Sequence, residues 1–191
     1  MIVAILASGN PNKLGELRAV LTGWQIEPLS ADGPNETGAT YRANALLKVR
    51  FGRERVDPAL WVLAEDSGIE CAALGGEPGL HSARWAAGRD AVEALLERLE
   101  GKADRTARMV SELVCLSPGG DQFAGSGVLE GTIASSPRGE SGFGYDPVFV
   151  PRGYDQTVAE LGEEWKTRHS HRALSALALD AAVLGASRRV E

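Results

Sequence analysis

The sequence predicts an α/β fold in which helices flank a mixed β-sheet. Residues 2–21 are typical of a strand, a tight loop and a helix, because an aliphatic run is followed by apolar residues at helical spacing. Residues 61–64 form a short apolar run of the kind found in buried strands. Residues 106–116 and 122–133 flank a Pro-Gly-Gly turn and predict a hairpin, so we expect antiparallel as well as parallel strand pairs.

Length and composition limit the class of protein. A chain of 191 residues with 43% hydrophobic residues is long enough for one well-covered core, so we expect one domain with two lobes. The net charge of −6 argues against a protein that holds nucleic acid stably through a broad basic surface. An anionic ligand would therefore have to meet a local cluster of basic residues.

The sequence also bears on location and on thiol chemistry. It contains neither a basic leader with a cleavage site nor an apolar run long enough to cross a membrane, so we expect a cytoplasmic protein without a membrane partner. Cys71 and Cys115 lack the spacing of metal ligands and are expected to be buried, reduced thiols.

The first helix is expected to begin at Pro11. Asn10 is a good N-cap and Pro11 suits the first helical position, so the loop leads directly into a helix N-terminus. The helix dipole favours phosphate there, and Lys13 in the first turn opposes the dipole unless an anion lies nearby. The phosphate-binding pattern GxxxxGK[ST] is absent, so an anion site and an ordinary strand-to-helix turn remain equal alternatives.

A small strand and a second helix are expected before the central strand. Residues 25–29 predict the strand, and residues 40–55 predict a helix with Lys48 among its mostly outward basic side chains. Glu36 lies just before this helix, where an acidic side chain complements the helix dipole.

The central strand is expected to end at Glu65 and Asp66, with Ser67-Gly68 forming a turn. Ligands of α/β sheets bind beyond the carboxyl ends of strands, which would place both carboxylates at a site. Solvated loop charges are the alternative, because acidic side chains are mostly exposed. Adjacent strand residues point to opposite faces, so the two carboxylates can act as one pair only if the strand ends between them.

The second half of the chain is expected to alternate between extended segments and helices. Residues 69–74 predict an extended segment, 90–100 a helix, 148–150 a strand and 157–161 a helical turn. Between these elements, the glycine-dense loop 137–147 carries two aromatic residues and an acid. Its aromatic rings are equally consistent with stacking on a nucleobase and with filling the core.

The last helix is expected to begin near Ser170. An apolar stripe at helical spacing is expected to face the core: Leu174, Leu177, Ala178, Ala181 and Leu184. His171 and Arg172 lie in the first turn, where cations oppose the helix dipole. Together with Lys13 and Lys48 they form a candidate anion-binding set in an acidic protein.

Seven short blocks occur in an order that resembles the non-standard purine nucleoside triphosphate pyrophosphatases, the Ham1-like or inosine triphosphate pyrophosphatase family. The blocks are Ser8-Gly9-Asn10 with Lys13, Glu36-Thr37-Gly38, Asn44-Ala45 with Lys48, Glu65-Asp66-Ser67-Gly68, Pro78-Gly79 with Ser82-Ala83-Arg84, residues 142–147, and Ser170-His171-Arg172. Each block is weak alone, but the likeness extends from residue 3 to about residue 180.

The resemblance implies a fold, an activity and an assembly. The fold would be an elongated central mixed sheet flanked by helices, with residues 1–191 forming a single domain of two lobes around a nucleotide-binding cleft. The activity would be Mg²⁺-dependent hydrolysis of ITP, dITP and XTP to the monophosphate and pyrophosphate, which cleanses the nucleotide pool. The chain would act as a homodimer on purine nucleoside triphosphates.

Site residues are carried over from the resemblance position by position. The expected substrate contacts are Ser8, Gly9, Asn10, Pro11, Asn12, Lys13 and Lys48 at the phosphates, Ser67, and Phe143, Gly144, Tyr145, Asp146, Lys166, His171 and Arg172 at the base. The expected metal ligands are Glu36, Glu65 and Asp66, with Asp66 also the general base. The family often has aspartate where this chain has Glu65, and many members have glutamate where it has Ala43.

Elementary chemistry supports these roles only in part. Mg²⁺ takes oxygen ligands and usually one or two carboxylates, and attack by water on a triphosphate needs a group that orients or deprotonates the water. Donors such as Lys166 or His171 would favour a 6-oxo purine over adenine, but they would not exclude guanine. The alternatives are a Maf-like pyrophosphatase acting on pyrimidine or modified nucleotides, and a nucleotide-sensing module without turnover.

Overall fold

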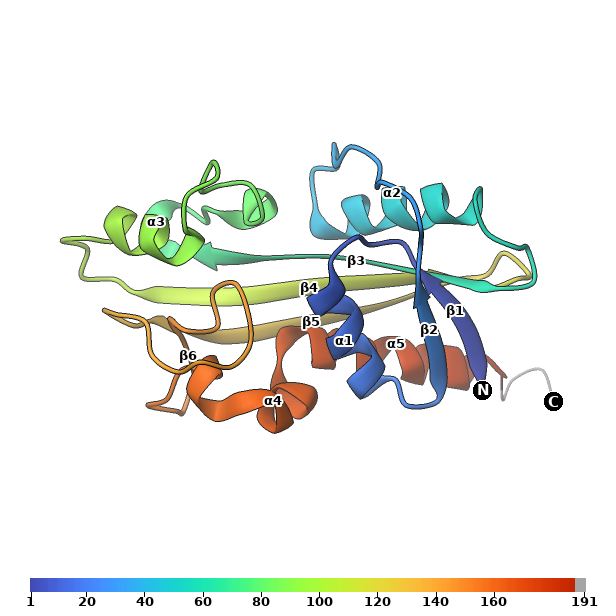
Figure 1. Cartoon of the computed structure of the whole chain (residues 1–191). Helices are drawn as coiled ribbons and strands as arrows, with labels where there is room; N and C mark the ends of the chain where they lie inside the picture. The colour runs from blue at the N-terminus through green and yellow to red at the C-terminus, as the bar shows by residue number, and fades with distance from the viewer. Residues whose placement is uncertain (188–191) are drawn as a thin grey trace. The chain divides into compact units, whose positions relative to one another are not determined.

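The computed structural model describes residues 1–187 and contains a six-stranded mixed sheet (Figure 1). The strands are β1 (Ile2–Leu6), β2 (Trp24–Pro28), β3 (Trp61–Cys71), β4 (Thr106–Leu116), β5 (Gln122–Ile133) and β6 (Phe149–Pro151). The α-helices are α1 (Pro11–Val20), α2 (Tyr41–Arg53), α3 (Ala91–Arg98), α4 (Val158–His169) and α5 (His171–Ser187), and short 3₁₀ helices are η1 (Ala72–Leu74) and η2 (Gly79–His81).

The sheet has the strand order β2-β1-β3-β4-β5-β6. Strand β1 pairs in parallel with both β2 and β3, whereas β5 and β6 are antiparallel. The α/β class with a mixed sheet and flanking helices is therefore confirmed. The elongated outline and the cleft between two lobes stay predictions.

The chain separates into two compact units, which we call unit 1 and unit 2. Unit 1 comprises residues 1–66, 111–127 and the chain from residue 171, and unit 2 comprises residues 67–110 and 128–170. The boundaries fall within β3, β4 and β5, so these strands contribute residues to both units.

Unit 1 has a helix on each face of its strands (Figure 1). Ala45 and Val49 of α2 pack in one core cluster with Val62 and Ala64 of β3. Leu63, which lies between those two strand residues, packs in another cluster with residues of α1 and α5. The alternation of side chains along β3 thus decides which helix each residue meets.

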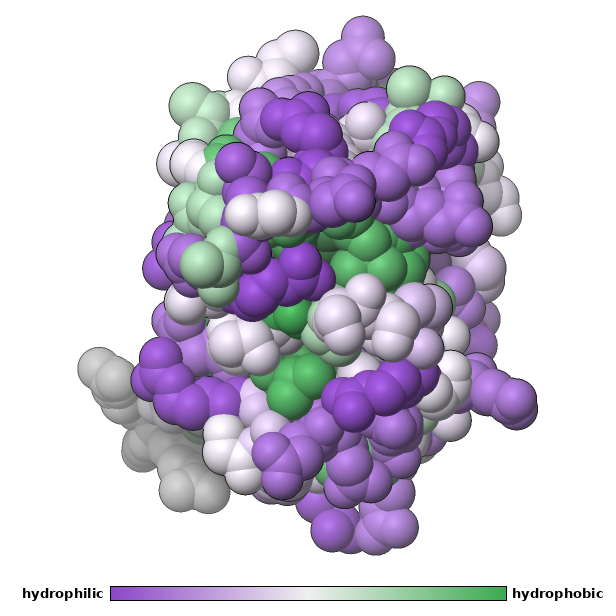
Figure 2. All heavy atoms as spheres, turned by 90° about the vertical axis from the view of Figure 1, so that its left-hand side faces the viewer, coloured by the Kyte–Doolittle hydropathy of each residue, from purple (hydrophilic) through white to green (hydrophobic). Residues whose placement is uncertain are grey.

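Unit 2 has a single apolar core, to which both of its α-helices contribute side chains. Leu95 and Leu99 of α3 and Val158 of α4 share this cluster with Met109 and Phe149 of the strands. On the face where α3 lies, hydrophilic residues surround a smaller hydrophobic area (Figure 2).

The expected turn at Ser67-Gly68 is wrong. Strand β3 continues without interruption from Trp61 to Cys71, so it includes the whole acidic block. Serine and glycine favour turns locally, but pairing with neighbouring strands overrides that preference. The extended segment expected at 69–74 is the end of this strand followed by η1.

The expected buried stripe of the last helix is also wrong. Leu174, Leu177 and Leu184 of α5 are exposed, whereas Ala176 and Leu179 are buried. The cause lies in β5, because a Cβ on Gly125 would approach the Ser175 carbonyl oxygen to 2.1 Å. The helix backbone lies directly against this strand, so mostly small side chains fit beneath it.

The helical segment near residue 160 is longer than expected. The sequence predicted only a turn at 157–161, but α4 continues to His169. Thr157 caps its N-terminus in a capping box with Glu160, and Gly162 has a non-helical φ of 81° that breaks the helix early. That glycine and the dense charges after it hid the helical period from the sequence pattern.

Candidate active site

The two adjacent carboxylates of β3 point to opposite faces of unit 1. Glu65 follows Leu63 onto the face covered by α1 and α5, and Asp66 follows Ala64 onto the face covered by α2. This follows from the two-residue period of a strand that does not end between them. Each carboxylate therefore belongs to its own cluster of polar groups.

The Glu65 cluster consists of Glu65, Lys13, Arg172, Glu16 and Ser111. Glu65 is 0% exposed, and its Oε2 lies 2.7 Å from Lys13 Nζ. Arg172, only 2% exposed, donates from Nε to Glu65 Oε1 at 3.1 Å and forms a close ion pair with Glu16. Ser111 donates its hydroxyl hydrogen to Glu65 Oε1 at 3.0 Å. Two carboxylates and two cations leave this cluster formally neutral.

The charge state of Glu65 is held by its cations. Burial alone would raise the pKa of Glu65, but the positive charges of Arg172, Lys13 and His171 outweigh it and hold that pKa well below its usual range. Burial likewise acts to lower the pKa of Arg172, and Glu65 and Glu16 raise it instead. The charged forms of Glu65 and Arg172 thus stabilise each other.

The Asp66 cluster consists of Asp66, Glu36, Lys48 and Asn44. Lys48 Nζ lies 2.9 Å from Asp66 Oδ1 and 2.5 Å from Glu36 Oε1. It also donates to the Glu65 main-chain oxygen at 3.2 Å. Asn44 donates from Nδ2 to Asp66 Oδ2 at 2.9 Å. Two carboxylates therefore share the Lys48 ammonium group.

Asn44 fixes the loop that brings Glu36 to Lys48. Its Oδ1 accepts the Gly38 N–H at 2.7 Å, while its Nδ2 binds Asp66. A side chain on Gly38 would collide with Asn44, since an added Cβ would lie 2.7 Å from Oδ1. Burial would lower the pKa of Lys48, but Asp66 and Glu36 raise it overall, so its ammonium form is stabilised.

The loop before α1 is open to solvent at its centre. Asn10 caps the helix, as expected, by accepting the N–H groups of Asn12 and Lys13. Gly9, Pro11 and Asn12 are exposed, and Ser8 Oγ accepts the Asn10 N–H at 3.3 Å. A phosphate at this end would compete with the Asn10 side chain for two of these amides.

In unit 2 the glycine-dense loop is organised by Asp146. Its Oδ2 accepts the Phe143 N–H at 2.8 Å and lies 2.7 Å from Lys166 Nζ of α4. Lys166 is buried and its ammonium nitrogen lies 4.9 Å from the centroid of the Phe143 ring. Gly142 leaves no room for a side chain, because a Cβ there would meet Asp146 Oδ2 at 2.2 Å.

The two aromatic residues of this loop have different positions. Tyr145 is buried in the core of unit 2 and donates its hydroxyl hydrogen to the Ser82 main-chain oxygen at 3.2 Å. Burial raises the pKa of Tyr145 to about 12. Phe143 is half-buried, and Gly144 beside it is exposed with a φ of 61°. Of the two rings, Phe143 is therefore the one available to a planar ligand.

The structure brings together only some of the predicted site residues. Lys13 and Arg172 meet at Glu65, and Lys48 meets Glu36 and Asp66, all in unit 1. Phe143, Asp146 and Lys166 meet in unit 2.

Two further predicted residues lie beside these clusters. Half-buried Ser67 follows Asp66 within β3, and half-buried His171 begins α5.

Three residues of these clusters had no predicted role: Glu16, Asn44 and Ser111. Asn44 lies one helical turn before Lys48, which places both on one face of α2 and is a signal that the sequence contained. Glu16 and Ser111 meet the site only through tertiary contacts, and nothing in their local sequence indicates this.

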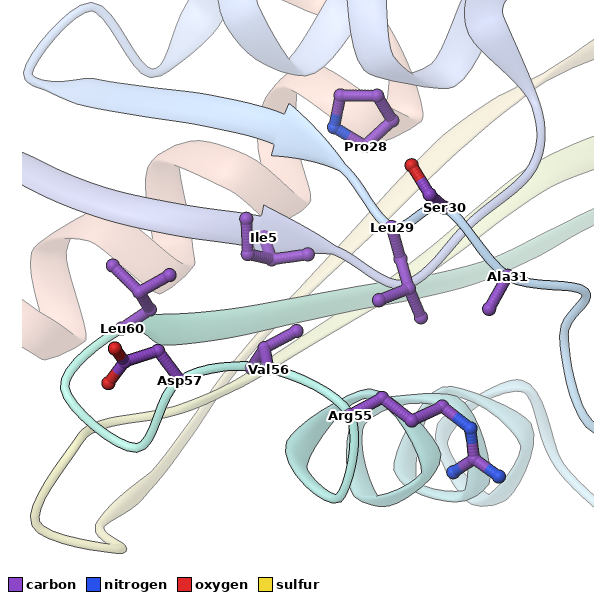
Figure 3. Close-up of a pocket in the computed structure, with 9 residues that line it drawn as sticks. All are labelled: Ile5, Pro28, Leu29, Ser30, Ala31, Arg55, Val56, Asp57 and Leu60. Atoms are coloured by element: carbon purple, nitrogen blue, oxygen red, sulfur yellow. The ribbon is translucent and has the colours of Figure 1, made fainter.

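A separate pocket of about 410 Å³ in unit 1 contains none of the predicted site residues (Figure 3). Its lining is Ile5, Pro28, Leu29, Ser30, Ala31, Arg55, Val56, Asp57 and Leu60. Its charged side chains form hydrogen bonds with nearby main-chain groups. Arg55 donates to the Phe51 carbonyl oxygen, and Asp57 accepts the Ala59 N–H. Both charged side chains of this lining therefore already have hydrogen-bond partners within the chain.

Residues 1–187 lack two further features. No helix in this range is long and apolar enough to cross a membrane. No group of three or more His, Cys, Asp or Glu side chains in the same range is arranged to hold a metal ion.

The chain is similar to known proteins over most of its length. Residues 4–182 match the Ham1 family. A protein from Exiguobacterium sp. named dITP/XTP pyrophosphatase is 42% identical over 190 residues, which cover 94% of this chain and 96% of that protein. A protein of the same name from Thermus thermophilus is 45% identical over 186 residues, which cover 92% of this chain and 88% of that protein.

Solved structures share the fold. The Ham1 protein of Staphylococcus aureus superposes with a TM-score of 0.83 at 33% identity, covering 96% of this chain and 99% of that chain. The nucleoside-triphosphatase, or dITP/XTP pyrophosphatase, of Mycobacterium abscessus superposes with a TM-score of 0.71 at 39% identity, covering 92% of this chain and 98% of that chain.

Proposed function

Because the chain belongs to the Ham1 family, we propose that it hydrolyses the non-standard purine nucleoside triphosphates dITP, XTP and ITP to the monophosphate and pyrophosphate. The observation that carries this proposal is 42–45% identity to two dITP/XTP pyrophosphatases over most of the chain. The activity would remove these nucleotides from the pool used for nucleic acid synthesis. The chain would act in the cytoplasm as a homodimer.

The phosphates are assigned to unit 1. The exposed loop from Ser8 to Asn12 leads into the N-terminus of α1, where main-chain N–H groups and the helix dipole favour an anion. Lys13 and Lys48 stand on opposite faces of β3 and would supply the positive charge that a triphosphate requires.

The Asp66 cluster fits a divalent cation. Nucleotide pyrophosphatases generally need such a metal, and we propose Mg²⁺ held by the carboxylates of Glu36 and Asp66 and by Glu65. In this structure it is the main-chain oxygen of Glu65, rather than its carboxylate, that faces the Asp66 cluster. One or two carboxylates plus phosphate oxygens and water are the usual Mg²⁺ ligands. When bound, the metal neutralises charge on the phosphate oxygens.

Asp66 is the proposed general base. A water molecule attacks the α-phosphorus, the bond to the bridging oxygen breaks, and pyrophosphate leaves with the electron pair of that bond. Asp66 accepts the proton that the attacking water loses. The hydrogen bond from Asn44 Nδ2 to Asp66 Oδ2 holds the carboxylate in a fixed orientation.

The base is assigned to Phe143, Gly144, Tyr145, Asp146 and Lys166 of unit 2, with His171, Arg172 and Ser67 as further contacts. Phe143 presents a ring for stacking, which is worth roughly 1–3 kcal/mol per base. The Lys166 ammonium beside it is a donor for a purine O6, whereas the amino group of adenine would leave that donor unpaired. Asp146 supports this pair by binding both Lys166 and the Phe143 N–H.

A nucleotide panel tests the proposal. The protein is incubated with ITP, XTP, dITP, GTP, ATP, dTTP and UTP, with and without Mg²⁺, and pyrophosphate is assayed against orthophosphate. We expect Mg²⁺-dependent pyrophosphate release from ITP, dITP and XTP. Release mainly from dTTP or UTP would indicate a Maf-like specificity instead. Binding without any release would indicate a nucleotide-sensing module.

A further inference from the structure

Lys48 has the surroundings of a bound metal ion. Its Nζ faces Glu36 Oε1 at 2.5 Å, Asp66 Oδ1 at 2.9 Å and the Glu65 main-chain oxygen at 3.2 Å. One of these oxygens belongs to Glu36 in the loop before α2. The other two belong to β3 and are the Glu65 carbonyl oxygen and an Asp66 carboxylate oxygen. All three lie close to the single positive charge of Lys48. Carboxylate and carbonyl oxygens are the ligands that hard divalent cations prefer.

We propose that Lys48 is a built-in occupant of the metal position. In the metal-free protein its ammonium group holds Glu36 and Asp66 together, and a divalent cation and Lys48 are alternative occupants of the same set of oxygens. When the cation arrives with the nucleotide, Lys48 turns from the carboxylates to the phosphates. This inference rests on the proposed function for the metal position and for the identity of the nucleotide.

Electrostatics explain why a removable occupant is useful. Glu36 and Asp66 lie within a few ångströms of one ammonium nitrogen, and two like charges brought together without a cation would repel. Lys48 removes that repulsion while keeping both carboxylates beside a position that a divalent cation could take. The free metal must displace the ammonium group, so wild-type protein without nucleotide should bind it weakly.

Lys13 provides the matched comparison. It is also a half-buried lysine of unit 1 paired with a carboxylate of β3, at 2.7 Å from Glu65 Oε2. Glu65 keeps Arg172 and Ser111 as partners if Lys13 is lost. Removing Lys13 therefore deletes the same charge without uncovering a pair of carboxylates.

Mn²⁺ titration in the absence of nucleotide tests the inference. The free ion is followed by electron paramagnetic resonance in wild type, Lys48→Met and Lys13→Met, with circular dichroism to verify the fold. We expect Lys48→Met to lower the Kd for Mn²⁺ by at least about tenfold, since a single charge at this separation is worth more than that factor. Lys13→Met should change it by less than about threefold. Unchanged or weaker binding by folded Lys48→Met overturns the proposal.

A measurement on unaltered protein covers the case in which Lys48→Met does not fold. The sequence has four lysines, Lys13, Lys48, Lys102 and Lys166, so ¹³Cε-lysine labelling gives a small set of NMR signals. Saturating Mg²⁺ without nucleotide should shift the Lys48 signal and leave that of Lys166 in place. A Lys48 signal that does not move at saturation overturns the proposal. Neither measurement uses turnover, so failure of the proposed activity would be seen separately in the nucleotide panel.

Discussion

The Glu65 cluster and the Asp66 cluster lie back to back on one strand, and they differ in how their charge is balanced. Glu65 is fully buried and its cluster is formally neutral, with an arginine shared between two carboxylates. The Asp66 cluster contains two carboxylates and one lysine. A buried network of paired charges holds elements in place, whereas two carboxylates that share one lysine offer oxygen ligands to a cation. Neighbouring residues of like charge can therefore have unlike roles.

The largest expected effect is the loss of turnover when Asp66 is replaced. Asp66→Asn preserves the shape of the side chain but removes the proposed proton acceptor. We expect kcat for ITP to fall by about 10²–10⁴-fold, the usual contribution of a general base. Nucleotide binding, measured by isothermal titration calorimetry, should be retained. Turnover near the wild-type rate would contradict the assignment of Asp66.

The next effect concerns stability on the other face of the strand. Glu65→Gln leaves Arg172 and Lys13 without their buried carboxylate, and such an unpaired buried charge costs about 3–5 kcal/mol. Urea denaturation in EDTA should show a loss of that size. Glu36→Gln is the matched control, because Glu36 is partly exposed and its loss should cost less than about 1 kcal/mol. Equal losses in the two variants would remove the distinction between the clusters.

The pH dependence of the Glu65 effect has a defined sign. The folded-state pKa of Glu65 is held below its value in the unfolded chain, so its contribution to stability is present above the unfolded pKa of about 4.3. That contribution is lost as pH falls toward the folded pKa. The stability difference between wild type and Glu65→Gln, measured by urea denaturation, should be constant from pH 7 to about 5 and should shrink at lower pH. A difference that grows on acidification would contradict the direction of the shift.

The smallest effect separates buried from exposed hydrogen bonds. Ser111→Ala removes a hydroxyl that donates to buried Glu65, and we expect a loss of about 1–3 kcal/mol in urea denaturation. Ser126→Ala removes the hydroxyl that donates to Glu112 at 2.6 Å in an exposed setting. The second substitution should cost less than about 0.5 kcal/mol. A larger loss for Ser126→Ala would show that burial does not set the value of these bonds.

Much of the fold could be predicted from periodicity, and the errors have one kind of cause. Local patterns predict β1 and β2, which precede and follow α1, and the hairpin of β4 and β5. Asn10 and Pro11 form the expected start of α1. Ser67-Gly68 has the composition of a turn but is extended, because partner strands satisfy its backbone. Side chains alternate between the two faces of a strand, so a strand that continues through these residues places Glu65 and Asp66 on opposite faces.

The last helix shows the same limit. Leucines predicted one face, but contact with Gly125 and Gly127 of β5 selects the face with alanines, since any side chain on those glycines would meet the helix backbone. The sequence indicated which residues belong to the candidate site, but it did not indicate which of them contact one another. Arg172 was expected at the base, and the structure buries it between Glu16 and Glu65. The sequence did not indicate these contacts because both partners are distant from Arg172 along the chain.

That separation in sequence has a consequence for synthesis. Arg172 lies 107 positions after Glu65, so at about 5–20 residues per second the ribosome delivers the arginine roughly 5–20 s after the glutamate. During that interval a growing chain contains the strand and Lys13 but lacks Arg172, the second cation that pairs with buried Glu65. The α5 helix thus completes the charge balance around Glu65 late in synthesis.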